Sequence, residues 1–300
     1  MTGPAGHPQA IATLLLLACM FGANHVAARV AFNDGVDVAT AVAVRSGATA
    51  VCVLLLLRVQ RVSLAMTRRH RRVLLGIGAL LSMQSLCLYS AVARLPVALA
   101  LLAFNTFPLW TALWSLLIYR RRPERKMLLA MPVILVGLAL ALDIGGAASG
   151  LAAADAWGRI GTGVAFAVTS AAVFGLALVL TQHEAATVDG RVRTAATMFV
   201  VATVALLVAQ GQGGLHGART ATGWWGLVAL TVLYGTAFTV MFTLLPRLGV
   251  VGHSPILNIE PVAALVLAWF VLDQAITPVQ IAGSLLVVGT VMVLGLRLRR

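Results

Sequence analysis

The sequence predicts an all-α integral membrane protein, and three observations lead to this fold class. Of the 300 residues, 60% are hydrophobic and only 10% are charged, whereas a soluble domain has about 45–50% apolar and about 25% charged residues. Apolar runs near the ~20 residues that a spanning helix requires recur along the whole chain. Short segments of alternating polarity, typical of a membrane β-barrel, are absent. A motif recurs at a constant distance, which indicates two halves built on one plan.

Ten spanning helices are expected from the apolar runs. The first has no Lys or Arg before it and a long apolar stretch, which favours a helix over a signal peptide. A Gly- and Ala-rich link separates the two halves, and Gly211–Gly214 is a second loose segment. The expected division is a first repeat at 1–143, a linker at 144–159 and a second repeat at 160–300. The expected spans are 10–31, 38–57, 73–92, 97–118, 127–143, 160–181, 194–210, 223–244, 250–272 and 279–296.

The two halves correspond at an offset of 153 positions. An odd number of spans in each half means that the second half enters the membrane upside down relative to the first. Five plus five spans therefore form an inverted repeat, an arrangement typical of secondary transporters. The matching segments are Phe21-Gly22 with Phe174-Gly175, Arg94-Leu95 with Arg247-Leu248, Val97 with Val250, and Asn105-Thr106-Phe107-Pro108 with Asn258-Ile259-Glu260-Pro261.

The basic residues indicate topology. The net charge is +13, and 21 of the 22 basic residues are Arg. In a soluble protein this excess would suggest a nucleic-acid partner. Here 17 basic residues lie in the connections after spans 2, 4, 6 and 8 and in the C-terminal tail, and four lie in the connections after the odd-numbered spans. The positive-inside rule then predicts cytoplasmic termini and no nucleic-acid partner.

Glu260 is the leading candidate for function. It is expected near the middle of span 9, and its counterpart in the first half is the apolar Phe107. A charge at the centre of a spanning helix costs about 2.5–3.5 kcal/mol on insertion scales, so it should face a cavity or a partner. Glu260 could carry a proton or contact a substrate amine. Alternatively, it is a protonated or paired carboxylate with a structural role.

Three further polar residues lie inside spans. Arg45 could pair with Glu260 or bind a substrate carboxylate, or its side chain could extend to the outer interface. His25 could shuttle protons near neutral pH, or it could hydrogen-bond to a neighbouring helix. Asn24 precedes it, and the second-half counterparts of both residues are apolar.

Asn105 and Asn258 each lie three residues before a proline, Pro108 and Pro261 respectively. Proline removes a backbone donor and can kink a helix. The amide side chains could satisfy carbonyls freed by such kinks. Alternatively, broken helices with exposed backbone dipoles could form a substrate site where the repeats meet.

Aromatic residues inside spans, such as Trp110, could line a site or pack between helices. Weaker candidates of this kind are Gln84, Tyr89, Trp114 and Tyr234. The sequence has no phosphate-binding Gly-rich loop for ATP and no Cys/His cluster for a metal. We therefore expect no cofactor, no metal and no enzymatic activity.

These residues resemble the EamA-type family of the drug/metabolite transporter superfamily. The similarity rests on Phe21-Gly22-Ala23-Asn24, on Arg45, on the stretch from Ala93-Arg94-Leu95 to Pro108, and on its repeat "EPVAALVLAWFVLDQAITPVQIAGSLLVVGTVMVL" from Glu260. Family members usually have Trp where Phe21 stands, and often Glu where Asp273 stands. Neither difference affects the expected fold, and both leave the substrate open.

The resemblance implies an inner-membrane transporter of small metabolites, commonly an exporter of amino acids or related compounds. Its cavity would be formed by spans of both halves, with spans 5 and 10 more peripheral, and rocking helices would give alternating access. Proton coupling through Glu260 is a further hypothesis. The alternatives are a membrane scaffold or assembly protein, and a membrane-embedded transferase. The expected partners are a small-molecule substrate and the bilayer, with the protein a monomer or homodimer.

Overall fold

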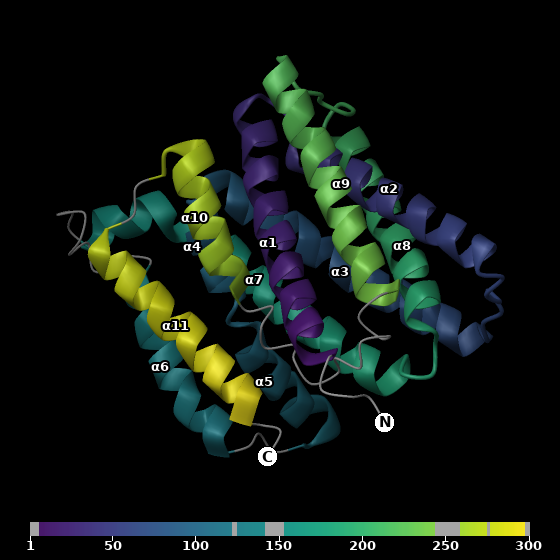
Figure 1. Ribbon diagram of the computed structural model, residues 1–300, viewed down its shortest axis with the longest axis horizontal. Helices are drawn as coiled ribbons and strands as arrows, with labels where there is room; N and C mark the ends of the chain where they lie inside the picture. Colours follow the sequence, from purple (N-terminus) through teal and green to yellow (C-terminus); the bar gives the residue numbers. More distant parts are fainter. Residues whose placement is uncertain (1–5, 122–124, 142–152, 244–258, 275–276, 298–300) are drawn as a thin grey trace.

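A computed structural model describes residues 6–121, 125–141, 153–243, 259–274 and 277–297, and within these ranges the chain forms helices and no strand (Figure 1). Seven apolar segments are long enough to cross a membrane, with α4 and α5 together making one of them, and three apolar helical segments are shorter. The helices are α1 Gly6–Asn33, α2 Val38–Val59, α3 Arg68–Arg94, α4 Val97–Phe104, α5 Phe107–Tyr119, α6 Arg125–Ala141, α7 Ala153–Glu184, α8 Gly190–Gly211, α9 Ala221–Thr243, α10 Glu260–Leu272 and α11 Pro278–Arg297.

The expected span 97–118 is interrupted. Helix α4 ends before Asn105, and α5 begins with Phe107 and has Pro108 in its first turn. Proline is favoured there because its missing N–H has no helical partner at that position. The hydroxyl of Thr106 donates to the carbonyl of Ala103 at 2.8 Å, which satisfies one of the carbonyls at the end of α4.

Helix α10 begins in the same way, with Glu260 and Pro261 in its first turn. The first part of the expected span, residues 250–258, lies outside the described residues. The preceding Ile259 has φ −73° and ψ −13°, close to the φ −73° and ψ −5° of Thr106 before α5. Both helices end in a left-handed residue, Arg120 and Asp273. Asn258, and with it the expected kink at that position, lies outside the described residues.

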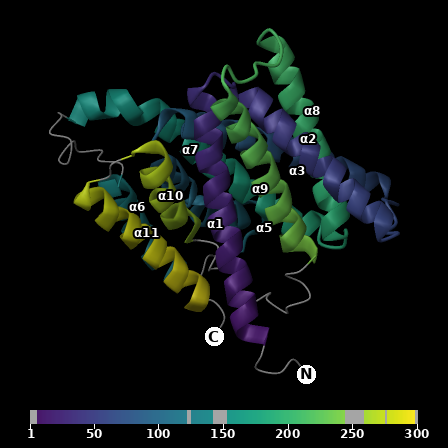
Figure 2. The same cartoon turned by 45° about the horizontal axis from the view of Figure 1, so that its top comes forward.

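The two halves of the chain interleave. Helix α1 packs against α9 and α10, while α7 packs against α3 and α5. The pairs α2–α8 and α6–α11 also take one helix from each half, and α6 and α11 lie side by side in both views (Figures 1 and 2). Replacing each helix by its counterpart in the other half turns α1–α9 into α7–α3 and α1–α10 into α7–α5. The same replacement leaves α2–α8 and α6–α11 unchanged. Each half therefore buries its apolar surface mainly against the other.

Two glycines at the expected offset allow a close approach of helix backbones in two of these pairs. A Cβ on Gly22 would lie 3.0 Å from the backbone nitrogen of Ala264 in α10. A Cβ on Gly175 would lie 2.8 Å from the backbone nitrogen of Thr111 in α5. Because Ala264 and Thr111 are themselves 153 positions apart, the same close approach occurs once for each half.

The connections gather at two opposite ends of the molecule. At the first end, Arg69 binds Glu184 at 2.8 Å, and Arg191 donates to Gln60. These contacts join the two basic connections, α2–α3 and α7–α8. A hydrogen bond from the Arg191 side chain there lowers the pKa of Asp189 to about 2.

At the second end, the connection between α1 and α2 meets the connection between α8 and α9. The Thr220 backbone N–H donates to Asp34 at 2.7 Å and lowers the pKa of this carboxyl group. The Nδ1 atom of His216 lies 3.3 Å from Oδ2 of Asp37. Helix α1 thus ends at the second end of the molecule, whereas α7 ends at the first. Gly213 and Gly214 have φ of +101° and +116° in this connection, as expected for a loose segment at 211–214.

Candidate functional site

Arg45 lies in the middle of α2 with only 3% of its surface exposed. Its guanidinium carbon is 4.7 Å from the ring centre of Tyr89 in α3 and 3.8 Å from that of Tyr234 in α9. Aromatic faces attract cations at such distances. The guanidinium also donates to the Tyr89 hydroxyl at 3.2 Å and to Ser85 Oγ at 3.1 Å. Arg45 is therefore held inside the helix bundle and does not extend to an interface.

The Tyr89 hydroxyl connects Arg45 to α1. It receives a hydrogen bond from Asn24 Nδ2 at 3.0 Å and lies 3.2 Å from Asn24 Oδ1. Asn24 and Tyr89 are both 0% exposed. Three helices, α1, α2 and α3, are thus joined through one phenol oxygen.

The side chains of His25 and Glu260 contact each other between α1 and α10. His25 Nε2 lies 3.4 Å from Glu260 Oε1, with side-chain exposures of 7% and 24% respectively. The imidazole ring also packs against Tyr89, with ring centres 5.3 Å apart. Glu260 lies in the first turn of α10. Glu260 pairs with His25 here rather than with Arg45.

We call these seven side chains, contributed by α1, α2, α3, α9 and α10, the central polar cluster: Asn24, His25, Arg45, Ser85, Tyr89, Tyr234 and Glu260. Three buried polar atoms in or beside it have no hydrogen-bond partner among the described residues: His25 Nδ1, Arg45 Nε and Ser46 Oγ. Leaving a buried polar group unpaired costs about 1–3 kcal/mol. Each of these three atoms therefore has an unused capacity to form a hydrogen bond.

The central polar cluster contains four of the residues that the sequence indicated: Asn24, His25, Arg45 and Glu260. Other candidates lie elsewhere. Asn105 is buried at the break between α4 and α5, and Pro108 and Pro261 begin α5 and α10. The backbone of Trp110 is part of the α5 surface that Gly175 closely approaches. Asn258 is outside the described residues.

Sequence reasoning did not identify Ser85 and ranked Tyr89 and Tyr234 low. A sequence pattern could have indicated Ser85 and Tyr89, because Ser82, Ser85 and Tyr89 are spaced by three and four residues. Such spacing places polar side chains on one face of a helix. Tyr234 has no such pattern, and only the packing of α9 against α1 and α2 brings it to Arg45.

Among the residues that the structure describes, no group of three or more His, Cys, Asp or Glu side chains is placed to hold a metal ion. The ionisable groups of the central polar cluster are instead arranged as a paired acid and base beside a separate cation. Such an arrangement can exchange a proton and bind an anionic group. It contains no nucleophile activated by a neighbouring base.

Comparison with known proteins identifies the family. Residues 9–142 and 161–296 each match the sequence profile of the EamA-like transporter family. No curated protein matches the sequence significantly. Fifteen chains of known structure match the fold.

One of these is a crystal structure described only as that of a protein. It is 19% identical to this chain, with a TM-score of 0.63, and the match covers 96% of this chain and 99% of the other. At this identity the likeness concerns the fold alone. The two profile matches, one for each half, together span most of the sequence. The chain therefore belongs to the EamA-like transporter family.

Proposed function

We propose that this protein is a secondary transporter that exports small metabolites by alternating access. The observation that carries this proposal is the His25–Glu260 pair, which bridges helices from different repeats. An ionisable pair at such a boundary can respond to a proton and change the contact between the halves. Ionisable groups inside membrane helices are rare because they are costly to bury, and they commonly mark substrate or proton pathways.

The interleaved helices support an inverted repeat of five plus five spans, with the division at 1–143, 144–159 and 160–300 kept as part of the proposal. Helix α1 and its counterpart α7 end at opposite ends of the molecule, as opposite orientations of the two halves require. In such an arrangement, rocking one set of helices against the other would open the site to each side of the membrane in turn.

We propose that the substrate carries a carboxylate beside an apolar or aromatic group, as an amino-acid-like compound does. Arg45 supports this assignment, because within the described residues no carboxylate pairs with it and its Nε is unpartnered. An arginine fork suits a planar carboxylate. The tyrosine faces around the guanidinium, Tyr89 and Tyr234, would contact the remainder of such a substrate.

The proposal extends to location and coupling. The basic connections at the first end support a place in the inner membrane with both termini cytoplasmic. A proton would enter on Glu260, weaken its attraction to His25 and release the α1–α10 contact. The protein would work as a monomer or homodimer in the bilayer and act on its small-molecule substrate.

Counterflow in proteoliposomes tests the proposal, because it requires no knowledge of the coupling ion. Vesicles loaded with one unlabelled compound would be offered the same compound in labelled form, for a panel of amino acids, nucleosides and cationic dyes. We expect saturable exchange of a carboxylate-bearing class. Absence of exchange across the panel, with folded protein verified by thermal unfolding, would favour the scaffold or assembly protein instead.

A further inference from the structure

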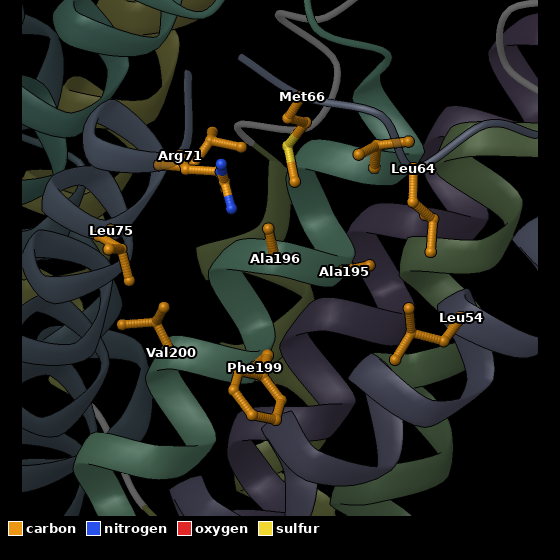
Figure 3. A pocket seen from close by; sticks show the side chains of 11 residues that line it. Leu54, Leu64, Met66, Arg71, Leu75, Ala195, Ala196, Phe199 and Val200 are labelled. Carbon is orange, nitrogen blue, oxygen red and sulfur yellow. The ribbon is translucent and has the colours of Figure 1, made fainter. Parts of the chain in front are cut away.

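An apolar groove of about 310 Å³ is lined by residues none of which belongs to the central polar cluster (Figure 3). Its walls come from α2, α3 and α8, and the connection between α2 and α3 carries Leu64 and Met66 over it (Figure 3). The groove forms because α3 and α8 diverge. They converge at Gly78, where an added Cβ would lie 2.7 Å from the Val200 side chain.

Arg71 is the one charged side chain among the residues that line this groove, and the nitrogens of its guanidinium point into the open space (Figure 3). Within the described ranges, no carboxylate forms an ion pair with Arg71. An apolar wall with an unpaired cation at its edge is complementary to an amphipathic anion.

The groove faces the bilayer. Leu75 and Phe199 on its walls are 58% and 62% exposed, which in a membrane protein is surface available to lipid. A second groove of about 600 Å³ adjoins it, because Leu54 and Leu64 line both. The second groove is lined by Arg58 and Arg61. Three arginines thus border two neighbouring apolar hollows.

We infer that this pair of grooves binds an anionic phospholipid, with one acyl chain between α3 and α8 and the phosphate at Arg71. Basic pockets between membrane helices on the cytoplasmic side bind anionic headgroups. A volume of about 310 Å³ also falls within the range of small-molecule sites. The inference rests on the proposed orientation of the chain in the membrane, but not on the proposed transport activity, because it concerns neither the central polar cluster nor any substrate.

Native mass spectrometry of the purified full-length protein can test this site. Protein in detergent would be titrated with phosphatidylglycerol or with phosphatidylcholine of the same chains. We expect one phosphatidylglycerol to be retained preferentially, and Arg71→Gln to reduce its retention about fivefold, the effect of one surface Arg on anionic lipid binding. Arg72→Gln removes the same charge from an exposed neighbour that does not line the groove, so we expect less than about a twofold effect.

Two further measurements distinguish the contribution of the acyl chain to lipid binding from that of the headgroup. Ala196→Phe narrows the groove without changing charge and should also reduce retention about fivefold. Glycerol phosphate, which has the phosphate but no acyl chain, should not displace the lipid at equal concentration. Equal retention of both lipids, equal effects of Arg71→Gln and Arg72→Gln, no effect of Ala196→Phe, or displacement by glycerol phosphate would each overturn the site.

Discussion

At the scale of single residues, the Tyr89 hydroxyl organises the centre of the molecule. It bonds to Asn24 in α1 and receives a hydrogen bond from Arg45 in α2. Polar groups buried in this way depend on each other, because removing one leaves its partners without a hydrogen bond. Within the described part of the chain, the hydroxyl group of Tyr234 makes one polar contact, at 3.9 Å to the sulfur of Met198. The two phenols therefore provide a matched pair for mutation.

Tyr89→Phe should destabilise the protein more than Tyr234→Phe. The first change leaves Asn24 and Arg45 short of a buried partner, at a cost of about 1–3 kcal/mol, whereas the second loses only a weak contact. Thermal unfolding of both variants in the same detergent measures the difference. A shift for Tyr234→Phe as large as that for Tyr89→Phe would contradict the role assigned to the Tyr89 hydroxyl.

Arg45→Lys should weaken binding of a carboxylate-bearing substrate by about tenfold, while leaving the site positively charged. Lysine lacks the planar fork and the flat face that fits between two tyrosine rings. The concentration of half-maximal counterflow measures this change. Arg94→Lys is the control, because Arg94 is exposed and donates to its own helix at Ser90. Unchanged half-saturation in Arg45→Lys would exclude Arg45 as the carboxylate site.

At the scale of helices, the spacing of apolar runs predicts most elements, because each spanning helix must satisfy its own backbone. The helix starts at Phe107 and Glu260 were harder to predict. A proline in an apolar run is compatible with a kinked helix or with a new one, and the surrounding packing decides between them. The described part of α10 begins at Glu260, and the position of Glu260 within the expected span 250–272 stays a prediction, because residues 250–258 lie outside the described ranges.

Gly175→Ala should destabilise the contact between α7 and α5. The new Cβ would meet backbone atoms of α5 at 2.8 Å, and overpacking of this kind costs about 1–3 kcal/mol. Gly76→Ala in α3 is the control, because no described atom lies within 4 Å of its added Cβ. The control should be neutral or stabilised by up to about 1 kcal/mol. Similar unfolding temperatures for both variants would contradict the close packing described here.

The connection between α1 and α2 should lose stability in acid. Burial raises the pKa of Asp37. Hydrogen bonds from Thr40 and His216 lower this pKa by more than burial raises it, so it lies below its usual value. A carboxyl group with a lowered pKa stabilises the fold above its ordinary pKa of about 3.9, and this contribution is lost as pH falls through the lower, folded-state value.

Asp37→Asn should therefore flatten the dependence of the unfolding temperature on pH below about pH 4. Asn can still cap α2, so a general loss of the helix is not expected. Asp273→Asn, at an exposed position, is the control and should follow the wild type. A wild-type pH profile in Asp37→Asn would show that Asp37 does not contribute to this dependence.

At the scale of the whole molecule, the halves share one packing plan and differ at their centre. The offset of 153 positions predicted matched helices, and Gly22 and Gly175 make the same type of contact in the two halves. The sequence also indicated Asn24, His25, Arg45 and Glu260 as candidates. It could not predict which of them meet, because helix rotation and the partners of α1 depend on contacts between distant segments. The pairing of His25 with Glu260 emerged only from the fold.

Proton coupling through the His25–Glu260 pair can be measured as substrate accumulation driven by a pH gradient in proteoliposomes containing the wild type or Glu260→Gln. Counterflow in the same vesicles shows that each protein is folded and binds substrate. For one proton per substrate, a gradient of one pH unit should drive up to about tenfold accumulation by the wild type. Glu260→Gln should retain counterflow and show no accumulation. Accumulation by Glu260→Gln equal to that of the wild type would contradict the account.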